Sequence, residues 1–190
     1  ISMLINICRL LEGELKKNDT FKCDIVLDSG AIKRSHGVAI EFVSDWQVIK
    51  TIPKTHSNIN NCTQAWSLAC DGKLKYSVKC RHITNYMNEL KISTDRYETK
   101  RPSTGIELLS ALKNILTCLQ DLHFNGFCHC DLRWPNILYR YCNYYLADFD
   151  NCQRIGAEIS SIYKHYPPDL HAASESASKK YTIKHDLYQI

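Results

Sequence analysis

Three polar side chains in the second half of the chain have types and spacings suited to metal-assisted chemistry. Asn136 follows Asp131 by five residues, and Asp148 comes directly after the apolar run YYLA. Carboxylate and carboxamide oxygens are the hard ligands that Mg²⁺ prefers. If one loop carries Asp131 and Asn136 and Asp148 ends a nearby strand, a metal ion and an incoming hydroxyl can meet there. That layout suits phosphoryl transfer, in which catalysis consists mainly of positioning and charge neutralisation.

The sequence around these residues resembles a known family. The segment HCDLRWPNIL is similar to the protein-kinase catalytic loop H-R-D-L-x-x-x-N, with the same distance from Asp131 to Asn136, and LADFD resembles the strand and D-F-G triplet after that loop. The stretch DLRWPNIL resembles in particular the kinase-like domains that are abundant in fungi, some of them attached to crinkler-type effectors. The resemblance implies an α+β, protein-kinase-like fold, and it is clearest from Leu90 to Asp150.

The resemblance also implies how the chain is divided. It implies a reduced, β-rich N-lobe, a hinge, and a truncated, mainly helical C-lobe, over residues 1–92, 93–101 and 102–190 respectively. Thr94 to Arg101 would then line the adenine side of a nucleotide site. A start at Ile1, without methionine, suggests a fragment.

Each polar residue of the loop acquires a role from the resemblance. Asp131 would be the catalytic base for a substrate hydroxyl, and Asn136 and Asp148 would bind Mg²⁺ or Mn²⁺. Arg133 stands where many protein kinases carry lysine, and its guanidinium can clamp phosphate oxygens. The alternatives are a turn residue at Asp131 and a surface arginine at Arg133. His129 is expected to hold the loop to the Asp148 segment.

Lys50 is the candidate for binding ATP. It ends the sequence VIK, where the kinase pattern V-A-I-K places the lysine that holds the α and β phosphates. Lys33, in AIK, is the competing candidate, and a surface lysine on a strand is the alternative. The chain lacks G-x-G-x-x-G, and no glutamate occurs between Lys50 and Glu89 to pair with the lysine. Gln64, in the possible helix CTQAWSLA, is the nearest polar substitute, but it cannot form an ion pair.

Three further positions are judged against the kinase pattern. Cys130 replaces the arginine of H-R-D, which often binds a phosphate on the activation segment, so control by that route is not expected. Asp150 replaces the glycine of D-F-G and adds a carboxylate that either strengthens a metal site or faces solvent. Asp186 resembles the helix aspartate that hydrogen-bonds the catalytic-loop backbone in kinases. The expected activation segment contains the possible phosphoacceptors Ser160, Ser161 and Tyr163.

Apolar periodicity predicts the elements that position these residues. Strands are predicted over 24–28, 38–43 and 46–52, and a helix over 1–17. The resemblance implies further strands over 89–93 and 144–147 and a helix over 184–190. Thr104 and Glu107 form a T-x-x-E capping box before an apolar stripe that ends at Leu122, which predicts a long helix. Asn125 and Gly126 are expected to close it. Loops or turns are predicted over 57–61, 71–72 and 172–180.

Composition limits the partners and the compartment. The 24 Lys and Arg against 20 Asp and Glu give a net charge of +4 without a block of like charge, which argues against nucleic acid. No apolar run approaches the roughly 20 residues that span a membrane. The ten cysteines are scattered, without C-x-x-C or a secretory leader, which favours reduced thiols in the cytoplasm or nucleus. Adjacent Cys128, His129 and Cys130 would point to opposite faces of an extended segment, which disfavours zinc.

Two functional hypotheses remain. The first is a phosphotransferase that uses ATP and Mg²⁺ to phosphorylate a Ser, Thr or Tyr hydroxyl, with a protein as the expected substrate. The second is a pseudokinase that acts as a binding or scaffold module, favoured by the missing Gly-rich loop and helix glutamate. A metal-dependent nuclease built on Asp24 and Glu41 is the least supported, because no lysine follows Glu41 two positions later.

Overall fold

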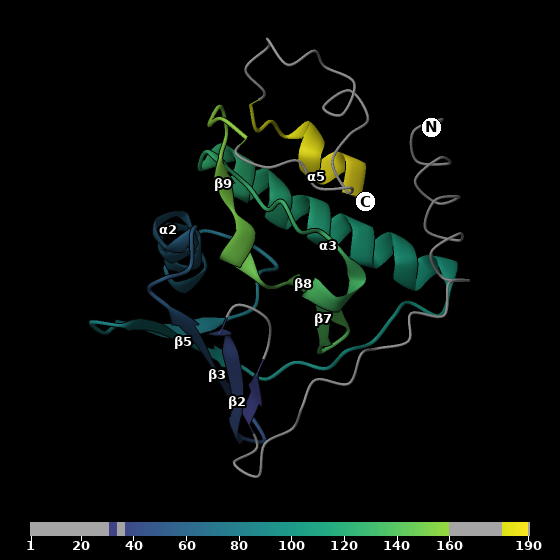
Figure 1. Cartoon of the computed structure of the whole chain (residues 1–190). Coiled ribbons are helices and arrows are strands. Elements are labelled where there is room, and N and C mark those ends of the chain that lie inside the picture. The colour runs from purple at the N-terminus through teal and green to yellow at the C-terminus, as the bar shows by residue number, and fades with distance from the viewer. Residues whose placement is uncertain (1–30, 34–36, 160–179, 190) are drawn as a thin grey trace.

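The computed structural model describes residues 31–33, 37–159 and 180–189 (Figure 1). Within these ranges the fold is mixed α+β, with three antiparallel sheets and three α-helices. The helix predicted over 1–17, the strand over 24–28 and the predicted phosphoacceptors Ser160, Ser161 and Tyr163 lie outside the described residues. The backbone of Lys33 is described, but its side chain is not.

The largest sheet has five strands in the order β1-β2-β3-β5-β4. Its strands are β1 (Ala31–Lys33), β2 (Ala39–Ser44), β3 (Gln47–Pro53), β4 (Cys80–Asn85) and β5 (Glu89–Asp95). The sequence predicted β2, β3 and β5 to within two residues of their ends. It missed β4, an edge strand whose side chains at Arg81, His82 and Asn85 are exposed. An edge strand of this kind lacks the apolar alternation that identifies half-buried strands.

The strand that carries Lys50 is central in this sheet. In β3, Lys50 pairs with Ile40 of β2 on one side and with Ile92 of β5 on the other. Pro53 is the last residue of β3, one residue beyond the predicted end, and it ends the strand because proline has no N–H for the sheet ladder. Two flanking strands therefore fix the backbone of Lys50.

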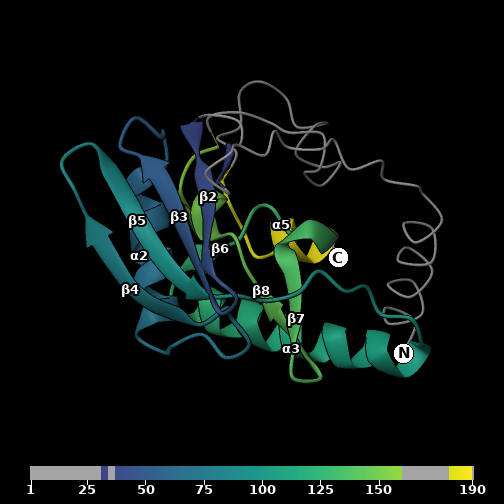
Figure 2. The ribbon, with the colours of Figure 1, turned by 90° about the horizontal axis from the view of Figure 1, so that it is seen from below.

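Helix α2 (Ile59–Cys70) connects β3 to β4 and lies beside the sheet (Figure 2). The predicted helix around Gln64 is confirmed, but α2 starts at Ile59, so residues 59–61 are helical and the predicted loop there is wrong. Its buried side chains include Cys62 and Trp66. The predicted turn at 71–72 is confirmed, with Gly72 at a φ of +69° that favours glycine.

The long helix α3 (Gly105–Phe124) confirms the predicted N-cap at Thr104, while the predicted partner Glu107 accepts from Ser103, one residue before the cap. Thr104 Oγ1 accepts a hydrogen bond from Glu107 N at 3.1 Å, while the Glu107 carboxylate accepts from Ser103 N at 2.7 Å. Hydrogen bonds from Lys100 and Ser103 lower the pKa of Glu107 to about 2. Asn125 caps the other end, and Gly126 follows with a φ of +82°, as predicted.

Short elements follow α3 in the chain, and the predicted loop lies among them. They are β6 (Phe127–Cys128), the 3-10 turn η2 (Trp134–Asn136), β7 (Ile137–Arg140), β8 (Asn143–Leu146), the 3-10 turn η3 (Phe149–Asn151), β9 (Gln153–Arg154) and α5 (Lys184–Gln189). β7 pairs with β8, and β6 pairs with β9. The strand predicted over 144–147 is thus confirmed with its ends shifted by one residue, and the helix predicted from residue 184 is confirmed through Gln189, the last described residue. The Val78 N–H donates to Leu146 O at 2.9 Å, which joins β8 to the segment before β4.

A single buried cluster runs from the sheet to α3. It contains Ile52 of β3, Leu90 of β5, Trp66 of α2, Leu119 of α3 and Phe149 of η3, each at most 2% exposed. This core positions the loop because close-packed interiors do not deform gradually.

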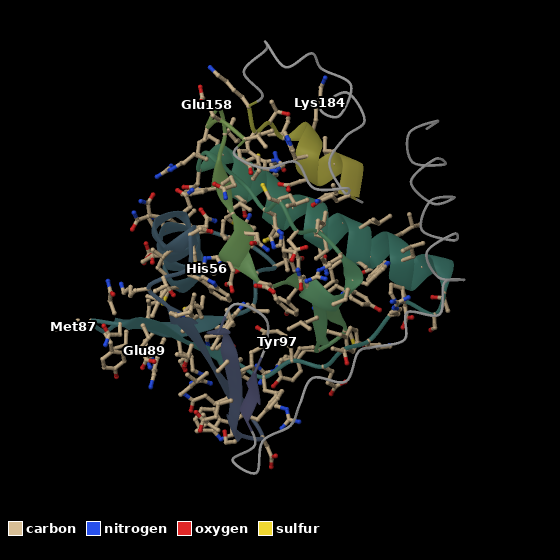
Figure 3. All side chains as sticks on the ribbon, in the orientation of Figure 1. His56, Met87, Glu89, Tyr97, Glu158 and Lys184 are labelled. Carbon is tan, nitrogen blue, oxygen red and sulfur yellow. The ribbon has the colours of Figure 1, made fainter. Side chains whose placement is uncertain are left out.

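The tip of the β4–β5 hairpin lies outside this core. Its Met87 is 91% exposed and lies far from α3 (Figure 3).

Candidate functional site

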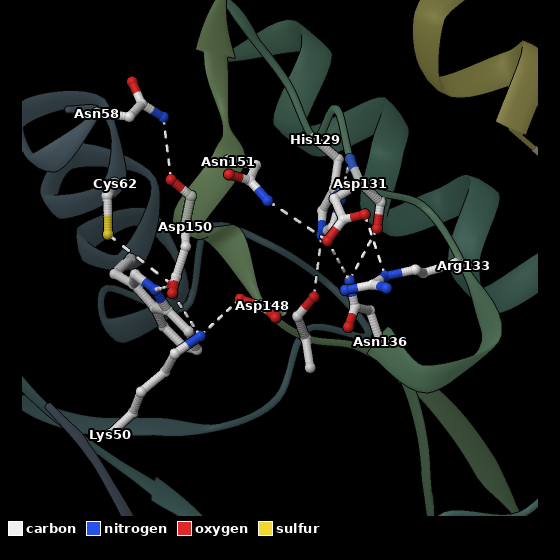
Figure 4. Close-up of polar contacts among 12 residues, drawn as sticks. Lys50, Asn58, Cys62, His129, Asp131, Arg133, Asn136, Asp148, Asp150 and Asn151 are labelled. Atoms are coloured by element: carbon white, nitrogen blue, oxygen red, sulfur yellow. Dashed lines mark hydrogen bonds and ion pairs between the residues drawn. The ribbon is translucent and has the colours of Figure 1, made fainter. Parts of the chain in front are cut away.

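The loop from Asp131 to Asn136 is closed by its own side chains. Asn136 ends η2 and is 2% exposed. Its Nδ2 donates to Asp131 O at 2.8 Å and to Asp131 Oδ2 at 3.1 Å (Figure 4). Because the nitrogen makes both bonds, Asn136 Oδ1 is the atom that can act as a metal ligand.

The Asp131 carboxylate has two further partners. Arg133 Nε lies 3.1 Å from Asp131 Oδ1, and Asn151 Nδ2 donates to Asp131 Oδ2 at 3.4 Å. The Arg133 side chain is 57% exposed and that of Asp131 is 21% exposed. The predicted pair Asp131 and Arg133 therefore lies together, with Arg133 exposed and Asp131 partly exposed.

Asp148 follows β8 in a backbone conformation that is unusual for a non-glycine residue. Its φ is +67° and its ψ is 61°, in the left-handed region. Non-glycine residues held in that region concentrate at functional sites. The preceding Ala147 N–H donates to Asn136 O at 2.9 Å, so the two predicted metal ligands come from adjacent backbone segments.

Lys50 reaches this segment from β3. Its Nζ lies 2.6 Å from Asp148 Oδ1 and 2.6 Å from Asp150 Oδ2, and its side chain is 12% exposed. Burial alone would lower the pKa of Lys50, but the charges of Asp148 and Asp150 outweigh burial and raise it above the ordinary value. Lys50 is therefore a buried, charged ammonium, and the surface-lysine alternative is wrong.

Asp150 is buried, which overturns the solvent-facing alternative. It is 5% exposed, and its Oδ1 accepts a hydrogen bond from Trp66 Nε1 at 3.0 Å. Burial raises the pKa of Asp150 above its ordinary value, with Lys50 opposing and Asp148 adding to the shift. Gln64 does not substitute for the missing glutamate, since its Oε1 accepts from Arg154.

α5 holds the loop backbone through the side chain of Asp186. The buried Asp186 carboxylate accepts hydrogen bonds from His129 N and Cys130 N, each at 2.8 Å, which confirms the contact predicted for Asp186. His129 Nε2 contacts Ala147 O at 2.9 Å, so this ring joins the loop to the Asp148 segment as predicted. Cys130 has a φ of +65°, a conformation that these bonds stabilise.

Sequence reasoning missed the residues that hold Asp150 and Asp131. Asn58 Nδ2 donates to Asp150 O at 3.0 Å and to Cys152 O at 2.6 Å. Trp66 and Asn151 were also missed. The Asn58 and Trp66 contacts join positions 84 to 94 residues apart, and nothing in the local sequence indicates them.

Besides its contact with Ala147, the His129 ring accepts a hydrogen bond from Asp131 N at 3.3 Å through Nδ1. All eight cysteines with described placement are free. In the described ranges, no three or more His, Cys, Asp and Glu side chains are grouped so that they could hold a metal ion. Asn136 and Asp148 form a different kind of pair, a carboxamide with a carboxylate. None of the described helices combines the length and the apolar character that crossing a membrane requires.

A cavity of about 420 Å³ lies beside the predicted hinge. It is lined by Asp45, Arg96, Tyr97, Glu98, Tyr139, Arg140 and Tyr141. The predicted site residues Lys50, Asp131 and Asp148 are not part of its lining. The chemistry therefore rests on the polar cluster of Figure 4 and not on this cavity.

No protein-family model matches this chain, and no curated protein matches it.

Proposed function

We propose that this chain is a protein-kinase-like phosphotransferase that moves the γ-phosphoryl group of ATP to a Ser, Thr or Tyr hydroxyl, with a protein as the substrate. The observation that carries the proposal is the 2.6 Å ion pair between Lys50 and Asp148, which are 98 residues apart in the sequence. It brings the proposed phosphate-binding lysine to the proposed metal ligand. Asp131 and Asn136 lie on the neighbouring loop.

The arrangement of elements supports the same proposal. Lys50 lies on the third strand of an antiparallel sheet, and α2 follows that strand, as the lysine strand and the αC helix do in protein kinases. After β5, the chain passes to α3 and to the loop elements. We therefore assign the sheet with α2 to a reduced N-lobe, the segment after Asp95 to a hinge, and the remainder to a C-lobe.

The donor set suits a hard divalent cation. Asn136 Oδ1 and the Asp148 carboxylate would hold Mg²⁺ or Mn²⁺, which would neutralise phosphate charge when bound. Lys50, Asp148 and Asp150 carry one positive and two negative charges, a net charge of −1 that favours a cation. Soft ligands such as thiolates, which zinc favours, are absent from this pair.

In the proposed transfer, each polar residue of the site has a separate role. Asp131 accepts the proton of the acceptor hydroxyl as its oxygen attacks the γ-phosphorus, and the bond from that phosphorus to the ADP oxygen breaks. Lys50 balances charge on the phosphates, and Arg133 can turn from Asp131 to a phosphate oxygen because it is exposed. Asn136 keeps Asp131 oriented through its amide nitrogen.

The test is transfer from labelled ATP in the presence of Mg²⁺, with Asp131→Asn and Asp148→Asn as the variants. Both should abolish transfer, but Asp131→Asn should still bind nucleotide, because Asp131 acts on the acceptor. Asp71→Asn is the matched control, since Asp71 is an exposed residue paired only loosely with Lys73 at 3.3 Å. Transfer that survives both site changes would refute the proposal.

One observation favours the alternative of a pseudokinase that serves as a binding or scaffold module. Both oxygens of Asp131 are occupied, Oδ1 by Arg133 and Oδ2 by Asn136, so the base is not free in this arrangement. A thermal melt with and without ATP and Mg²⁺ separates the two functions, because a ligand that binds only the folded state raises the melting temperature. A raised melting temperature without any phosphate transfer would identify the binding module.

A further inference from the structure

The Lys50 ammonium pairs with two carboxylates, those of Asp148 and Asp150. In the proposed reaction it would keep only one of them. Asp148 is the proposed metal ligand, so its oxygens are needed by the cation. A buried ammonium without a partner is costly, because burial removes its hydration. Some other group must therefore hold Lys50 when Asp148 turns to the metal ion.

Helix α2 does not supply that group. Protein kinases pair the strand lysine with a helix glutamate. The α2 sequence INNCTQAWSLAC contains no acidic residue, and Gln64 is engaged by Arg154. The remaining carboxylate at Lys50 belongs to Asp150, at 2.6 Å.

Contacts with helix α2 and its N-cap fix the position of Asp150. Its Oδ1 accepts from Trp66 Nε1 at 3.0 Å and lies 4.0 Å from Cys62 Sγ, and its backbone oxygen accepts from Asn58 at 3.0 Å (Figure 4). All three partners belong to α2 or its N-cap. Asp148, in contrast, has a side chain that is 20% exposed, against 8% for Asp150.

The attachment of α2 extends beyond Asp150. Asn58 also donates to Cys152 O at 2.6 Å, and Asn61 Nδ2 donates to Gln153 Oε1 at 3.0 Å. Phe149, next to Asp150, packs edge-on against Trp66 with ring centres 5.1 Å apart. Helix α2 and the segment from Phe149 to Gln153 therefore form one packed unit.

We infer that Asp150 is the positioning residue for Lys50. It replaces the absent carboxylate of helix α2, and it does so from η3, the turn that packs against α2. The inference rests on the proposed function. Asp150 keeps the Lys50 ammonium paired and aimed at the phosphates, which releases Asp148 to bind the metal ion. Asp150 lies in a 3-10 turn and is not among the residues with a positive φ, so its backbone does not require the glycine of D-F-G.

The first variant is Asp150→Asn, which removes the charge and keeps the shape. With only Asp148 left as its carboxylate partner, Lys50 competes with the metal ion for Asp148. The Mg²⁺ concentration for half-maximal transfer and the KM for ATP should each rise about ten-fold, as expected for a lost charge-assisted hydrogen bond. A residue that only supports the fold would lower kcat and the melting temperature without changing the Mg²⁺ requirement.

The second variant moves the carboxylate onto the helix. Cys62 Sγ lies 4.0 Å from Asp150 Oδ1, so Cys62→Glu combined with Asp150→Gly carries a carboxylate from α2 into the space vacated beside Lys50. This double variant should return the Mg²⁺ requirement and the KM to within about three-fold of the wild type, which is less than 1 kcal/mol. Asp150→Gly alone should not.

The outcomes separate the two claims. A wild-type chain that neither binds ATP nor transfers phosphate refutes the proposed function. A wild type that transfers phosphate, with an unchanged Mg²⁺ requirement in Asp150→Asn, refutes the role of Asp150 alone. If Asp150→Asn does not fold, the double variant decides: restored folding and transfer support the inference, and a folded but inactive double variant overturns it.

Discussion

At the scale of single residues, the account depends on how one buried positive charge is balanced. Lys50 lies between Asp148 and Asp150 at 2.6 Å from each, at a site from which water is largely excluded. The pair of carboxylates tolerates this proximity because the ammonium lies between them. Removal of the ammonium would leave two like charges facing each other, one on the buried Asp150 and one on the partly buried Asp148.

Lys50→Met tests that balance. The substitution keeps the apolar stem and removes the charge, so the free energy of unfolding should fall by about 3–5 kcal/mol at neutral pH. Chemical denaturation measures the change. Lys73→Met is the matched control, because the Lys73 side chain is 56% exposed, and it should change stability by less than about 0.5 kcal/mol. Equal, small effects of the two substitutions would show that Lys50 does not carry a buried ion pair.

At the scale of elements, the loop from Asp131 to Asn136 depends on a short helix that is distant in sequence. α5 supplies Asp186, which is fully buried and accepts hydrogen bonds from His129 N, Cys130 N and His123 Nε2. α5 also supplies Gln189, whose Oε1 accepts from Leu132 N at 2.8 Å. The loop geometry at Asp131 is therefore set from outside the loop.

Asp186→Asn tests this dependence. An asparagine amide presents a donor to one of the two backbone N–H groups, which is then buried without an acceptor. We expect the free energy of unfolding to fall by about 3 kcal/mol, and phosphate transfer to fall with it. Asp71→Asn again serves as the control at an exposed carboxylate. Unchanged stability and transfer in Asp186→Asn would show that α5 does not hold the loop.

Elements with strong local signals could be predicted from the sequence. The Thr104 cap and the apolar stripe of α3 are local features. The cap is confirmed, and Leu112, Ile115, Leu119 and Leu122 of the stripe are buried, whereas Leu109 and Leu116 are exposed. The contacts of Asp186 and His129 were also predictable, because the resemblance places both residues in motifs. β4 and the start of α2 were not, since an edge strand and a polar first turn lack an apolar pattern.

The environment of Asp150 could not be predicted, for a different reason. Its burial arises when α2 packs on a segment more than 80 residues later in the chain, and this contact depends on the complete core. The sequence alone showed an extra carboxylate beside Asp148. Whether that carboxylate met solvent, metal or lysine depended on tertiary packing.

At the scale of the whole molecule, one core joins the sheet, α2, α3 and the loop elements. Phe149 is fully buried in it, in contact with the ring of Trp66 from α2 and the ring of His129 from the loop. Lys50, Asp131 and Asp148 are carried on parts of this one core, so their relative positions are fixed by packing. Such preorganisation is what a transferase of phosphoryl groups needs.

The rate of phosphate transfer from labelled ATP, wild type against Asp131→Asn, tests the central claim most directly. The account predicts Mg²⁺-dependent phosphate on a Ser, Thr or Tyr side chain, and a rate at least about 100-fold lower in the variant, as expected for loss of a general base. ATP should raise the melting temperature of both proteins. A wild-type rate that Asp131→Asn leaves unchanged would contradict the account.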